Sequence, residues 1–114
     1  MTTLYGISNC DTVRRARRWL ADNAIQYRFH DVRKDGLDKV TVQYWVTELG
    51  WETLINRNGR TWRALPENIR AGLKEDKAVT LMTDEPALIK RPVLRVGDRH
   101  FVGFKDHDYQ RIFG

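Results

Sequence analysis

The stretch LYGISNCDTVRRARRWL, residues 4–20, sets the architecture of this chain. A short apolar run at 4–7 is typical of a β-strand, and apolar residues at positions 13, 16 and 20 follow the spacing of an amphipathic helix. The polar turn between them puts Cys10, the single cysteine, at the start of that helix. Free N–H groups and the helix dipole favour an anion there, so the sequence predicts a reactive thiolate. The alternative is a small buried core residue, which the polar neighbours of Cys10 disfavour.

Beyond this stretch the pattern is that of an α/β protein. Alternating apolar residues at 25–29 predict a second strand, which is parallel to the first because a helix joins the two. A second amphipathic helix covers 42–49 and ends at Gly50. Residues 51–83 contain a loop and short helical fragments, and we expect no strand there.

The last third of the chain predicts a β-hairpin and a closing helix. Strands at 93–96 and 99–102 flank a two-residue connection that begins with Gly97, and residues 106–113 have helical spacing. These elements predict an α/β fold with a thioredoxin-like, mixed four-stranded sheet and an inserted helical lobe. We expect one domain over residues 1–114, with its core at about 1–33 and 85–114 and its helical insertion at about 37–84.

Composition restricts the location and the partners. With a single cysteine the chain cannot form an internal disulfide, and no segment approaches the ~20 apolar residues of a membrane span. We therefore expect a cytoplasmic protein without a membrane partner. The net charge of +5 is compatible with nucleic acid, acidic lipid or a small anionic substrate, and charge alone does not choose among them.

Two classes of site are absent from the sequence pattern. His30, His100 and His107 are far apart, so the chain lacks the ligand spacing of a metal site and we predict no metal. The glycines are isolated, so there is no glycine-rich phosphate loop. We expect no tightly bound cofactor.

Arginines are the candidate anion-binding residues. The run at 14–18 contains too many arginines for one helical stripe, and a solvated helix face is the favoured interpretation. Arg57, Arg60 and Arg91 lie in loop-like segments, where a planar guanidinium can bind an oxyanion or a carboxylate through two hydrogen bonds. Spacing alone does not bring these arginines together.

Three further features each have a structural alternative. Pro92 precedes the hairpin, where a proline simply starts a strand or, in the cis form, exposes backbone groups to a substrate chain. The four tryptophans are predicted to be core or lobe-interface residues rather than stacking platforms for bases. Asp11 is predicted to cap the helix rather than to act as a base.

Several segments together resemble one family. They span nearly the whole chain and comprise residues 4–12, 17–20, 27–31, 48–52, 81–83, 89–92 and 102–104. This pattern resembles the ArsC/Spx family, and within it the YffB-type branch of glutathione-dependent, reductase-like proteins. The resemblance implies a thioredoxin-like fold with a helical insertion, a nucleophilic Cys10 and a cis peptide bond at Pro92. It also implies that Asn9, Arg57, Arg91 and Pro92 bind the substrate or its anionic groups.

Two departures from the family pattern make two of the family's functions less favoured. The third arginine of the family falls at Gly103, and the loss of this donor makes arsenate a less favoured substrate. Spx regulators carry a second cysteine where this chain has Val13, so an internal redox switch is disfavoured.

The sequence therefore predicts a glutathione-dependent thiol/disulfide reductase that uses Cys10. Glutathione is the expected co-substrate, glutathione or a glutaredoxin is the resolving partner, and the substrate is a small-molecule or protein thiol compound. One alternative is an arsenate reductase linked to glutathione or glutaredoxin. The other is a non-enzymatic, Spx-like regulator that binds RNA polymerase. Direct binding of nucleic acid through the arginine run is the least favoured hypothesis.

Overall fold

The computed structural model describes residues 1–114 and divides into two compact units. The first unit comprises Met1–Asp35 and Arg91–Gly114, and the second comprises Gly36–Lys90. Residues 85–90, which we expected in the core, lie in the second unit. None of the helices combines the length and the apolar character that a membrane span requires.

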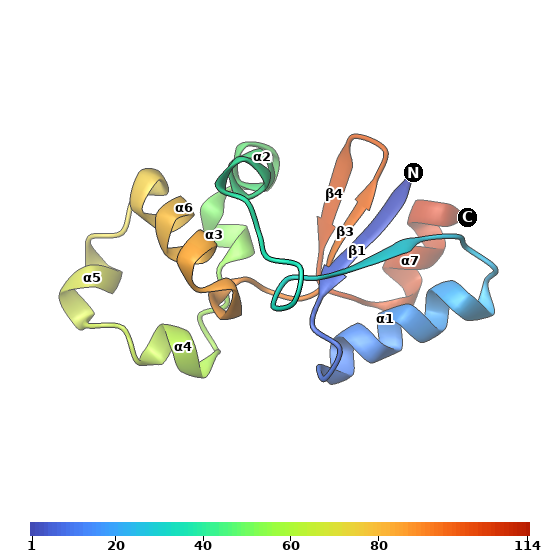
Figure 1. Ribbon diagram of the computed structural model, residues 1–114, viewed down its shortest axis with the longest axis horizontal. Helices are drawn as coiled ribbons and strands as arrows, with labels where there is room; N and C mark the ends of the chain where they lie inside the picture. The colour runs from blue at the N-terminus through green and yellow to red at the C-terminus, as the bar shows by residue number, and fades with distance from the viewer. The chain divides into compact units, whose positions relative to one another are not determined.

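The first unit contains one four-stranded sheet in the order β2-β1-β3-β4 (Figure 1). Its strands are β1 (Thr2–Gly6), β2 (Arg28–Asp31), β3 (Val93–Val96) and β4 (Arg99–Val102). β1 and β2 are parallel, whereas β1–β3 and β3–β4 are antiparallel. The predicted α/β fold with a thioredoxin-like, mixed four-stranded sheet is therefore confirmed.

The second strand begins later than its apolar alternation predicts. Ala24 turns with a φ of +55°, and the N–H of Ile25 donates to the carbonyl of Leu20 at 2.9 Å. Because the chain is still leaving the helix at this point, pairing with β1 starts only at Arg28.

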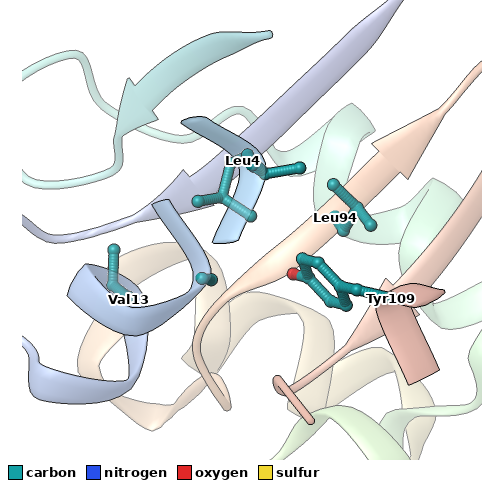
Figure 2. Close-up of a cluster of buried hydrophobic side chains, with 6 residues drawn as sticks. Leu4, Val13, Leu94 and Tyr109 are labelled. Carbon is teal, nitrogen blue, oxygen red and sulfur yellow. The ribbon is translucent and has the colours of Figure 1, made fainter. Parts of the chain in front are cut away.

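A row of apolar side chains crosses the sheet and forms the core of this unit. Leu4 pairs with Phe29 on one side and with Leu94 on the other, and Leu94 pairs with Phe101. Helices α1 (Asp11–Asp22) and α7 (Asp106–Phe113) contribute to the same core. Figure 2 shows this cluster, whose buried members are Leu4, Val13, Ala16, Leu20, Leu94 and Tyr109. Full burial of one such aliphatic side chain stabilises the fold by about 1.5–3 kcal/mol.

The second unit is helical. Its elements are α2 (Lys39–Leu49), α3 (Trp51–Leu54), α4 (Arg60–Arg63), α5 (Glu67–Ala71), α6 (Glu75–Asp84) and the 3-10 helix η1 (Pro86–Leu88). Gly50 ends α2 with a φ of +86°, as its position after the last apolar residue predicts. The short helices α3 and α4 were not predicted, because a single turn is too short to show a helical period. An isolated antiparallel bridge joins Ile55 to Ile89.

Candidate functional site

Most of the predicted site residues lie at one edge of the sheet. The register aligns Gly6 with Asp31, and Val93 pairs with both Tyr5 and Val102. The carboxyl ends of β1, β2 and β4 and the amino end of β3 therefore meet at this edge, which we call the cysteine edge. The segments that flank these strand ends include Asn9 and Cys10 after β1, and Arg91 and Pro92 before β3.

Cys10 occupies the N-cap position of α1. Its φ of −102° and ψ of 126° are extended, and its carbonyl accepts the N–H of Arg14 at 2.9 Å, which closes the first helical turn. The side chain is half-buried against the core cluster and makes no capping hydrogen bond. The sulfur is therefore at the amino end of the helix and partly accessible, as residues 4–20 predict.

A close contact holds the turn that carries Cys10. A Cβ atom added to Gly6 would lie 2.8 Å from a methyl group of Val13, which is closer than real side chains approach. Only glycine therefore lets the end of β1 pass so near the first turn of α1. Asn9 is exposed in the turn between them.

The prediction that Asp11 caps the helix is wrong. Cys10 is the cap, and Asp11 is the first helical residue, where its carboxylate forms an ion pair with Arg14. The Asp11 side chain is 90% exposed, so its charge faces solvent.

Pro92 stands directly before β3, and the Arg91–Pro92 peptide bond is cis. Pro92 is buried and Arg91 is half-buried. The carbonyl of Pro92 accepts the N–H of Gly103 at 2.8 Å, which ties the segment after β4 to this position. Asn9, Cys10, Arg91 and Pro92 thus share the cysteine edge within the first unit.

Asp31 is a buried carboxylate at the same edge that the sequence analysis did not identify. Its Oδ1 accepts the backbone N–H of Arg33 at 2.9 Å and that of Lys34 at 3.1 Å. Burial raises the pKa of Asp31, but these two hydrogen bonds and the positive charges of Lys34 and Arg33 outweigh it, and the pKa is lowered from 3.8. An aspartate at the end of a strand, with polar residues at 33–35 and Gly36 after it, was the available signal for such a turn.

Arg57 belongs to the second unit and has different surroundings. It lies in the loop between α3 and α4, and its guanidinium carbon is 5.8 Å from the ring centroids of both Trp51 and Trp62. Trp45 is buried as predicted, whereas Trp51 and Trp62 are half-buried.

The arginine run on α1 splits into two pairs with different surroundings. Arg14 binds Asp11, and Arg17 lies 4.1 Å over the ring of Phe29. Arg15 and Arg18 instead line a groove of about 490 Å³ between α1 and residues 104–107. Arg14, Arg15 and Arg18 are exposed, as the interpretation of a solvated helix face predicts.

The chain is similar to several known proteins. The model of the ArsC family matches residues 5–112. The solved structure of the YffB (PA3664) protein is 44% identical, covers 100% of both chains and superposes with a TM-score of 0.95. An arsenate reductase (ArsC) related protein from Brucella melitensis is 45% identical, with 98% of this chain and 93% of that chain covered and a TM-score of 0.81. Global transcriptional regulator Spx 1 from Bacillus cereus is 26% identical over 98% of this chain and 86% of its own length.

Proposed function

Because the chain belongs to the ArsC family, we propose that it is a glutathione-dependent thiol–disulfide reductase whose nucleophile is Cys10. The observation that carries the proposal is the place of the single cysteine: it caps α1 at the edge of the sheet where Arg91 and Pro92 precede β3. The family and the arsenate reductase related neighbour support a thiol reductase.

The reaction has two thiol–disulfide exchange steps. In the first, the Cys10 thiolate attacks the glutathione sulfur of a mixed disulfide, the substrate S–S bond breaks, and the substrate leaves as a thiolate that takes up a proton. In the second, the thiolate of free glutathione attacks the glutathione sulfur bound to Cys10. This forms oxidised glutathione and regenerates the Cys10 thiolate. Since the chain has one cysteine, the second thiol must come from outside, from glutathione itself or from a glutaredoxin.

The other proposed residues bind rather than react. Arg91 and Arg57 are proposed to bind carboxylates of glutathione, because a guanidinium donates two parallel hydrogen bonds to a carboxylate. Asn9, exposed beside the nucleophile, is proposed to donate a further hydrogen bond. The backbone beside Pro92 is proposed to pair with the peptide. No tightly bound cofactor is proposed, and a reducing, cytoplasmic location suits a protein that depends on a free thiol.

Replacement of the nucleophile tests this proposal. The Cys10→Ser variant should lose all reduction of the mixed disulfide between glutathione and 2-mercaptoethanol, followed through NADPH consumption by glutathione reductase. Ser8→Ala, in the same turn, is the matched control and should retain activity. Activity retained by Cys10→Ser would contradict the proposal.

Arsenate reduction is the second candidate, favoured by the likeness to the Brucella melitensis protein. It would use the same nucleophile, with Arg57 and Arg91 as oxyanion ligands and Lys105 as a further cation. Arsenate-dependent NADPH consumption in a glutathione-coupled assay distinguishes it from the first proposal.

A regulator that binds RNA polymerase is the third candidate, favoured by the likeness to Spx 1 over 98% of this chain. Capture of polymerase by the wild type and equally by Cys10→Ser, together with the absence of thiol transfer, would support it.

A further inference from the structure

We infer that Trp51 and Trp62 are positioning residues that hold the guanidinium of Arg57 ready for an anionic group of the substrate. This inference rests on the proposed function, in which Arg57 binds such a group. It concerns only the second unit, where all three side chains lie.

Two indole rings lie within cation–π range of the same guanidinium. The guanidinium carbon of Arg57 is 5.8 Å from the centroid of Trp51 and 5.8 Å from the centroid of Trp62, within the ~6 Å range of a cation–π contact. One ring comes from α3 before the arginine and the other from α4 after it. Contacts with two rings restrict the rotamers of a side chain that would otherwise lose much conformational entropy on binding.

The backbone around Arg57 is also anchored. The Oδ1 of Asn56 accepts the N–H of Asn58 at 3.2 Å, and the guanidinium of Arg63 donates to the carbonyl of Asn58 at 2.7 Å. The N–H of Asn56 donates to the carbonyl of Leu88 at 2.7 Å. Both the backbone and the side chain of Arg57 are therefore held by the unit itself.

The held guanidinium still has hydrogen-bond capacity. It forms an ion pair with Oε2 of Glu52 at 3.8 Å, which is beyond hydrogen-bonding distance. The Arg57 side chain is 52% exposed. A fixed, partly exposed guanidinium whose donors are not saturated is suited to a carboxylate or a tetrahedral oxyanion.

A double-mutant cycle on the full chain tests the inference with the mixed disulfide of glutathione and 2-mercaptoethanol as substrate. Trp51→Leu and Trp62→Leu should each raise KM about 2–5-fold with kcat unchanged, because the rings act on binding through Arg57. Trp51→Phe and Trp62→Phe should recover most of the loss, since an aromatic face remains. In the Arg57→Gln background, loss of either ring should raise KM no further. Tyr44→Leu, which removes an exposed aromatic ring of α2 in the same unit, is the control and should leave KM unchanged.

The KM values of these variants test the role of the two tryptophans independently of the proposed function. If Arg57→Gln raises KM and the leucine variants raise it further by independent factors, the rings only pack, and the positioning role is overturned while Arg57 keeps its role. If Arg57→Gln leaves KM unchanged, the inference fails, whereas the chemistry of Cys10 still stands or falls with the Cys10→Ser variant.

Tryptophan fluorescence is a second readout, which leaves both rings in place. It keeps the inference testable if the leucine variants do not fold. Titration with oxidised glutathione should change the tryptophan emission of the wild type, and Arg57→Gln should abolish that change. An emission change that is the same in both proteins, or absent from the wild type, would overturn the inference.

Discussion

Gly103 shows how one backbone conformation disfavours the arginine that the family resemblance implies at this position. Its φ of +82° lies in the left-handed region, and its N–H donates to Pro92 at the cysteine edge. A side chain with a Cβ is strained there, by about 1–2 kcal/mol. An arginine at this position would therefore have to adopt an unfavourable backbone conformation.

Gly103→Arg should accordingly destabilise the protein by about 1–2 kcal/mol, measured by urea unfolding. Gly103→Ala, which has the same backbone strain without a guanidinium, should lose a similar amount. Full stability of the arginine variant would show that this backbone accepts a side chain without strain.

Asp31 links the stability of the cysteine edge to pH. Its pKa is lowered in the folded protein, so below about 3.8 the unfolded state binds more protons and the contribution of Asp31 to stability is progressively lost as pH falls. Asp31→Asn should be less stable than the wild type at pH 6, by about 1 kcal/mol, and the gap should narrow at pH 3.

Urea unfolding at the two pH values measures this difference. Asp38→Asn is the control, since the Asp38 side chain makes no capping hydrogen bond at the start of α2. If the difference in free energy of unfolding between wild type and Asp31→Asn stays constant from pH 6 to pH 3, Asp31 is not the source of this pH dependence.

Helix α7 places a tyrosine, Tyr109, in the hydrophobic core. Tyr109 is 1% exposed, and its ring packs edge-on against Trp19 and Phe104 at centroid distances of 5.6 and 4.7 Å. Figure 2 shows its hydroxyl among apolar side chains, and that oxygen has no hydrogen-bond partner. Burial raises the pKa of Tyr109 well above its ordinary value of 10.0.

Tyr109→Phe should therefore leave stability at pH 7 unchanged or raise it by up to about 1 kcal/mol, because it removes a buried polar group without a partner. Since the folded state retains the Tyr109 proton, the wild type should lose stability as pH rises past about 10, and the phenylalanine variant should lose less. Urea unfolding at pH 7 and pH 10.5 checks this, with the exposed Tyr44→Phe as control. A clear loss of stability in Tyr109→Phe at pH 7 would contradict it.

Periodicity predicted the elements that are long enough to show it. Helix α1, helix α2 with its end at Gly50, and helix α7 were predicted from helical spacing. The hairpin was predicted from its two-residue connection, which begins with Gly97. Single-turn helices such as α3 and α4 carry no such pattern, and the late start of β2 depends on a turn at Ala24 that composition does not reveal.

Across the whole molecule, the candidate site could be predicted only in part. The placement of Cys10 follows from local sequence, since a strand, a turn and a helix determine it. The proximity of Cys10 to Arg91 and Pro92 depends on the pairing of β1 with β3, which are separated by most of the chain, and only the family resemblance indicated it. The two rings beside Arg57 were interpreted as core or lobe-interface residues, because no spacing rule relates a loop arginine to aromatic residues in the flanking turns.

The central claim is that Cys10 accepts glutathione and returns it to a second glutathione. The most direct measurement is the intact mass of the native protein after incubation with oxidised glutathione, followed by addition of reduced glutathione. We predict one glutathione adduct on Cys10, which reduced glutathione then removes. A native protein that forms no adduct, while the same protein in urea forms one, would contradict the claim.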